Sequence, residues 1–142
     1  MRMQFWVLLF ALGSILIFSC QSVDLGSHIF LMRGDRAEDG IMVICDKGKS
    51  YGECVAGSYL IPQNYNAHFD STGRYREYVR KYAANKNYVL AATFLIGTKK
   101  NRYWIVEKKQ NLEVRVLGPF EEDAFSKEKQ RRNIDLQLQP AW

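Results

Sequence analysis

The chain has 142 residues and a formal net charge of +5, with 20 basic and 15 acidic side chains. This positive excess is modest and its basic residues are scattered along the chain, whereas a nucleic-acid-binding surface gathers them on one face together with stacking aromatic rings, so we expect no nucleic-acid partner. The length suits one domain with a single hydrophobic core.

The first 19 residues have the layout of an export signal. Arg2 precedes an apolar run over residues 5–18, which is interrupted only by Gly13 and Ser14 and ends two residues before Cys20. A membrane-spanning helix needs about 20 predominantly apolar residues, so this run is short for a permanent anchor. We therefore predict that residues 1–19 are a removable signal peptide, with an uncleaved anchor as the alternative.

Ile17, Phe18, Ser19 and Cys20 resemble the lipobox of bacterial lipoproteins, in which the cysteine is acylated and becomes the first residue after cleavage. The resemblance implies a lipoprotein whose Cys20 carries acyl chains such as palmitate, and two or more chains would hold the domain firmly on a membrane. An ordinary signal peptide cleaved nearby is the alternative. Gln21 is not the aspartate that retains lipoproteins at the inner membrane of enteric bacteria, so we expect the outer membrane, facing the periplasm.

Two cysteines remain once Cys20 is assigned to the lipid. Cys45 and Cys54 form an even pair in a compartment that favours oxidation, which predicts a disulfide between them. Residues 40–45 are predicted to form a strand and residues 46–53 a loop, so the bridge would close the base of that loop. Two free thiols are the alternative, although the spacing differs from that of redox-active dithiols.

The N-terminal half of the exported part is predicted to be extended. Residues 20–26 are expected to be a short tether, and residues 27–142 a single globular domain. Strands are predicted over residues 27–33, 40–45 and 55–61. The segment 74–82 is ambiguous, because its tyrosines fit one face of a helix and also alternate as they would in a strand.

The C-terminal half contains the strongest local signals. Residues 88–96 are rich in β-branched and aromatic side chains and predict a central, buried strand. Strands over 102–107 and 112–117 would complete a meander. A helix is predicted over 120–132, with acidic residues near its start and basic residues near its end, followed by an amphipathic strand over 134–139. The fold class expected is α+β and mostly β, with a single antiparallel sheet of five to seven strands and one C-terminal helix packed on it.

Three blocks in this half are YVLAA at 88–92, YWIVE at 103–107, and VLGPF at 116–120 with Phe125 just after it. They resemble a family of small exported bacterial proteins known only as domain of unknown function 3997, although that family more often has an aspartate at the position of Glu107. The resemblance implies a small β-rich lipoprotein with no assigned activity and no catalytic residues to carry over.

The sequence contains no local signature of catalysis. His28 and His68 are the only histidines, and neither has further metal-ligating residues at a suitable spacing, so we expect no metal and no cofactor. The residues around Lys49 resemble the end of a phosphate-binding loop, but Val43 stands where that motif needs a glycine. No serine nucleophile elbow is present.

Four aromatic residues are candidate binding residues, because amphipathic rings suit recognition surfaces: Tyr75, Tyr78, Tyr82 and Trp104. Core packing is the alternative use of these side chains. We interpret the protein as a non-enzymatic binding or structural module of the cell envelope that recognises a protein, peptide or glycan. A small envelope hydrolase is the alternative, and it would bring His28 or His68 to carboxylates in a pocket.

Overall fold

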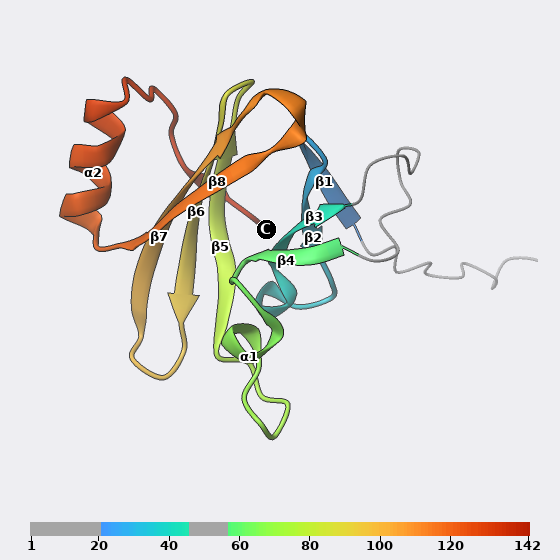
Figure 1. Ribbon diagram of the computed structural model, residues 1–142. Coiled ribbons are helices and arrows are strands. Elements are labelled where there is room, and N and C mark those ends of the chain that lie inside the picture. The colour runs from blue at the N-terminus through green and yellow to red at the C-terminus, as the bar shows by residue number, and fades with distance from the viewer. Residues whose placement is uncertain (1–20, 46–56) are drawn as a thin grey trace, which may run out of the picture.

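A computed structural model describes residues 21–45 and 57–142, and the expectations for residues 1–20 and for Cys54 lie outside this part. The described residues form two antiparallel sheets, one of four strands and one of five, with one helix longer than two turns (Figure 1). The chain is mostly β, as predicted. The expectation of a single sheet is wrong, because the strands divide into two sheets that pack face to face.

The four-stranded sheet has the order β1-β2-β3-β4 and comes from the first half of the chain. Its strands are β1 (Gln21–Gly26), β2 (Ile29–Arg33), β3 (Ile41–Cys45) and β4 (Gly57–Ile61). The predicted strands at 27–33 and 40–45 are confirmed with shorter bounds, and the one at 55–61 is confirmed over its described residues, 57–61. The expected tether instead forms β1, which pairs with β2 from Gln21↔Arg33 to Gly26↔Ile29.

The five-stranded sheet has the order β8-β7-β6-β5-β9. Its strands are β5 (Glu77–Ala84), β6 (Tyr88–Leu95), β7 (Lys100–Lys108), β8 (Val114–Phe120) and β9 (Gln139–Pro140). The predicted meander and the central position of β6 are confirmed. The ambiguous segment is mainly a strand, and the bulge between Val79 and Lys81 in β5 explains why its side chains do not alternate regularly.

In the part of the chain that the structure describes, two α-helices and two short 3₁₀ turns connect the strands. The helices are α1 (Tyr65–His68) and α2 (Glu122–Arg131), and the turns are Ala37–Asp39 and Gln110–Leu112. The predicted helix at 120–132 is confirmed as α2, with acidic residues in its first turn and basic residues in its last. Within the described residues, no helix combines the length and apolar character needed to cross a membrane.

The chain after α2 differs from the prediction of a strand over 134–139. Only Gln139–Pro140 pairs with another strand, as β9 against β5. The apolar residues of the preceding segment still turn toward the sheet, and Ile134 is buried. The Leu136 carbonyl, which would bond to a neighbouring strand if this segment were in a sheet, accepts a hydrogen bond from Lys129 Nζ at 2.6 Å instead.

The core lies on both faces of the five-stranded sheet. One face packs against the four-stranded sheet, and the other is covered in part by α2 and by residues 134–138 (Figure 1). This arrangement explains the unbroken buried run from Val89 to Thr93 in β6. A strand covered on both faces has no side that must stay polar.

A hydrogen-bonded group of polar side chains lies between the two sheets. Glu77 is 1% exposed and forms an ion pair with Arg102. Thr93 Oγ1 donates to a Glu77 carboxylate oxygen at 2.5 Å and accepts a hydrogen bond from Trp104 Nε1 at 3.0 Å. The buried carboxylate is therefore both paired and hydrogen-bonded, which is the condition for burying a charge without a large penalty.

Candidate functional site

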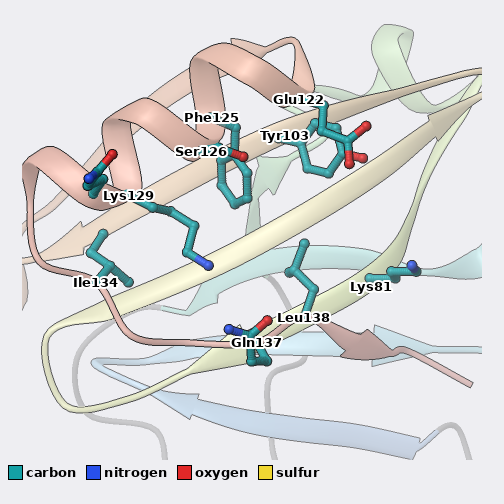
Figure 2. A pocket seen from close by; sticks show the side chains of 10 residues that line it. Lys81, Tyr103, Glu122, Phe125, Ser126, Lys129, Ile134, Gln137 and Leu138 are labelled. Carbon is teal, nitrogen blue, oxygen red and sulfur yellow. The ribbon is translucent and has the colours of Figure 1, made fainter.

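A groove of about 430 Å³ lies between α2, the segment after it and the outer face of the five-stranded sheet (Figure 2). The helix and the residues 134–138 form its two walls, and side chains from the sheet complete it. It is lined by Lys81, Tyr103, Glu122, Phe125, Ser126, Lys129, Gln130, Ile134, Gln137 and Leu138.

The wall formed by α2 follows from the spacing of its residues. The five lining residues of α2 lie at the positions 122, 125, 126, 129 and 130, which is the spacing of one helical face. Phe125 is the one buried residue of this helix, and the neighbouring Ala124 is exposed. Phe125 is therefore the main contact of α2 with β7 and β8, and the other side chains on this face of the helix line the open groove.

The apolar part of the groove centres on two stacked rings. Tyr103 and Phe125 have centroids 4.9 Å apart and planes 25° apart. Burial raises the pKa of the Tyr103 hydroxyl, and the nearby Glu122 carboxylate raises it further. The hydroxyl is therefore protonated at neutral pH and can donate a hydrogen bond.

The polar part of the groove offers donors and acceptors of both charges. Lys129 joins the two walls, since its Nζ bonds to the Leu136 carbonyl and lies 5.8 Å from the centre of the Phe125 ring. Figure 2 shows Glu122 and Lys81 toward the end of the groove away from Ile134. The lining residues include amides, hydroxyls, a carboxylate and ammonium groups but no histidine or cysteine, so the arrangement is suited to recognition of a polar ligand.

A second pocket of about 450 Å³ lies where the turn after β1 meets the turn after β5. Its central side chain is Lys108, whose Nζ donates to the backbone carbonyl of Asn85 at 2.7 Å and to that of Leu25. Burial lowers the pKa of Lys108. The lysine joins the two sheets through backbone groups, and we assign it a structural role.

The four aromatic candidates from the sequence do not share one surface. Trp104 is 2% exposed and Tyr82 is half-buried, and both pack in the core between the sheets. Tyr78 contacts Phe94, with ring centroids 5.9 Å apart, and Tyr75 packs near α1 while its hydroxyl bonds to Asp39. None of the four lines the groove.

Neither histidine lines either of the two pockets. His68 is 2% exposed, and its Nδ1 donates to the Glu77 carbonyl at 2.6 Å. His28 is half-buried in the turn between β1 and β2. In residues 21–45 and 57–142, no three histidine, cysteine or acidic side chains are grouped closely enough to hold a metal ion.

The cysteine assignments stay predictions. Cys45 is the last residue of β3. Cys20 and Cys54 lie outside the described residues, so lipidation of Cys20 and the pairing of Cys45 with Cys54 are untested.

The groove residues themselves were not identified from the sequence. Tyr103 and Phe125 occur in the blocks that carry the family resemblance, but nothing in the sequence indicated that they stack. The one available signal was the helical spacing from Glu122 to Gln130, which places polar side chains beside Phe125 on the face expected to be buried.

Comparison with known proteins identifies a family without an assigned activity. The family model described as "Protein of unknown function (DUF3997)" matches residues 31–141, which include every residue that lines the groove. No curated protein and no solved structure matches the chain. The family predicted from the three sequence blocks is confirmed.

Proposed function

The chain belongs to the DUF3997 family of proteins of unknown function, and from this premise we propose that it is a lipid-anchored binding module of the bacterial cell envelope. Its ligand-binding site is the groove beside α2, and its ligand is a polar envelope component that contains sugar or peptide groups. The observation that carries the proposal is the pairing of stacked aromatic rings with amide, hydroxyl and charged side chains in one open groove.

The chemistry of the groove favours a saccharide or peptide over an apolar ligand. Gln130 and Gln137 each offer an amide that can donate and accept hydrogen bonds, and the Tyr103 hydroxyl adds a donor. The stacked rings and Leu138 supply apolar contact for the less polar faces of such a ligand. Fragments of the bacterial cell wall combine sugars, amides and carboxylates, so they match this set of groups.

The proposed location is supported by the sequence features of the N-terminus. The apolar run over 5–18 and the lipobox-like residues before Cys20 favour export and acylation. We expect wild type expressed in a bacterium to be membrane-bound with an intact mass of residues 20–142 plus acyl groups, and Cys20→Ala to lose both properties. A wild type that keeps residues 1–19 or carries no acyl mass would exclude the proposed anchor.

Binding is preferred to hydrolysis because of where the histidines lie. His68 is buried and its Nδ1 donates to a backbone carbonyl, and neither His68 nor His28 lines the groove that contains Ser126. A serine hydrolase needs a general base within hydrogen-bond reach of its nucleophile. The groove therefore supports recognition without a covalent step.

Isothermal titration of the mature protein with soluble cell-wall fragments tests the proposed ligand. Three probes separate its chemistry: intact sugar-peptide fragments, sugar chains alone and stem peptides alone. We expect binding of the intact fragments and of at least one of the two parts. If none of the three probes binds, the proposed ligand class is contradicted.

A matched pair of variants on α2 tests the groove itself. Ser126→Trp places a large ring in the groove, whereas Lys127→Trp places the same ring on the adjacent exposed position, which does not line it. We expect S126W to weaken binding at least about tenfold, equivalent to a loss of about 1.4 kcal/mol, and K127W to bind as wild type does. Equal affinities for the two variants would place the binding site elsewhere.

A further inference from the structure

We propose that this domain rests directly on the lipid bilayer, with the end of the four-stranded sheet where β1 begins against the lipid headgroups and Trp142 among them. The inference deepens the proposed function and rests on the acylation of Cys20. The partner that this surface would contact is the lipid bilayer, which is distinct from the ligand proposed for the groove.

The first step is the length of the connection. Gln21 is the first residue of β1 and is joined to Cys20 by a single peptide bond. Consecutive Cα atoms are about 3.8 Å apart, so an acylated Cys20 would hold the beginning of β1 within a few ångströms of the headgroups. Because β1 is paired with β2 along its length and Leu25 is buried, the described chain belongs to the folded domain from Gln21 onward.

The second step identifies what surrounds this end of β1. Gln21 pairs with Arg33, and Arg33 Nη1 donates to the carbonyl of Ala141 at 3.1 Å. The next residue, Trp142, lies beside Gly40, where an added Cβ would be 3.6 Å from the indole Nε1. Trp142 is 48% exposed, so its ring is available at the surface beside the proposed anchor.

The third step concerns the chemistry of this surface. Tryptophan is enriched at membrane–water interfaces, because its ring is apolar and its N–H can bond to headgroups. The charged residues nearby are of both signs, with exposed Arg36 and Asp35 and half-buried Arg33 and Glu38. This mixed charge suits a zwitterionic headgroup layer, so the acyl chains and the ring hold the domain without a need for anionic lipid.

The resulting orientation leaves the groove accessible. β1 and α2 lie on opposite sides of the five-stranded sheet (Figure 1). A bilayer at the beginning of β1 therefore contacts the four-stranded sheet, and the groove beside α2 lies on the other side of the five-stranded sheet, clear of that contact.

Fluorescence quenching by brominated lipids tests this contact. The full chain is expressed in a bacterium, its acylation is verified by intact mass, and the mature protein is reconstituted in vesicles of brominated phosphatidylcholine. Removal of residues 1–19 eliminates Trp6, so Trp104 and Trp142 are the emitters, and Trp104 is buried. We expect quenching to remove most of the Trp142 emission in wild type, and Trp142→Phe to leave only emission that the bromines do not affect.

A lengthened connection is the matched control. A Gly/Ser linker of about 16 residues inserted between Gln21 and Ser22 keeps the residue next to Cys20 and spans about 20–24 Å on average. We expect this variant to lose most of the quenching. Acylated protein without quenching, or equal quenching with the linker, overturns the inference alone, whereas absence of acyl mass overturns the proposed anchor and the inference with it.

Discussion

His68 is a buried titratable group whose surroundings oppose its protonation. Its ring contacts Phe69 and Tyr75, with centroids 4.2 Å and 5.5 Å away. Burial lowers the pKa of His68 from the usual 6.5, and the Glu77 carbonyl and the Asp39 carboxylate offset only part of this effect. The neutral ring, with its Nδ1 hydrogen on the Glu77 carbonyl, is therefore the form that the fold accommodates.

The free energy of unfolding should fall as the pH drops below the usual histidine pKa. As the pH passes downward through 6.5, the unfolded chain takes up a proton at His68 that the folded chain does not, so stability decreases by up to about 1.4 kcal/mol per pH unit. Urea denaturation between about pH 5 and 7 measures this slope. His68→Asn should lose the slope while keeping a side-chain donor for the Glu77 carbonyl.

His28→Asn is the control for that measurement. His28 is half-buried in a turn and has a positive φ, which asparagine tolerates well. We expect it to retain the slope of wild type. If the slope survives in H68N and disappears in H28N, the pH dependence arises from His28 and the assignment to His68 is wrong.

The C-terminal end of α2 determines where the second wall of the groove begins. Asn133 has a φ of 53°, and its N–H bonds to the Gln130 carbonyl while the Ile134 N–H bonds to the Lys129 carbonyl. These two bonds form a Schellman motif, which ends the helix and reverses the chain. The motif turns Ile134 into the core and starts the segment that faces α2 across the groove.

Substitutions at Asn133 should separate backbone strain from side-chain loss. Asn133→Ala places a Cβ without a compensating polar group in the left-handed region and should lower the free energy of unfolding by about 1 kcal/mol. Asn133→Gly removes the strain and should remain within about 0.5 kcal/mol of wild type. Urea denaturation distinguishes the two, and equal losses would show that the asparagine side chain, not the backbone conformation, matters.

At the scale of the molecule, residues 21–45 and 57–142 form three layers, with the five-stranded sheet in the middle. The four-stranded sheet covers one face through a shared core, and α2 with the following segment covers part of the other. β1 belongs to this assembly because Leu25 packs in the same core as Trp104 and Val106. The first described residues are therefore part of the folding unit.

Truncation of Leu25 should show that β1 contributes to the stability of the domain. Leu25 is 4% exposed, so Leu25→Ala should lower the free energy of unfolding by about 2–5 kcal/mol through lost burial and a cavity. Ser22→Ala, on the exposed side of the same strand, should change it by no more than about 0.5 kcal/mol. Denaturation of both variants checks this, and an L25A variant as stable as wild type would mean that β1 acts as a tether.

The two strongest local patterns in the sequence were sufficient to predict the elements that they form. The β-branched and aromatic run at 88–96 was enough to predict β6 and its central position, since few other structures accommodate such a run. The charge gradient from Glu122 to Arg131 was enough to predict α2, because it complements the helix dipole. The family could also be predicted, because its blocks are short contiguous segments.

The division into two sheets and the groove were decided only by the tertiary structure. Alternation along a strand indicates that one face is buried but not which strand lies opposite, so Trp104 and Tyr82 could be read as surface residues until the four-stranded sheet was seen to cover them. The groove depends on Lys81, Tyr103 and Leu138, which come from separate parts of the chain. Their proximity follows from packing between layers, and periodicity within one segment carries no information about it.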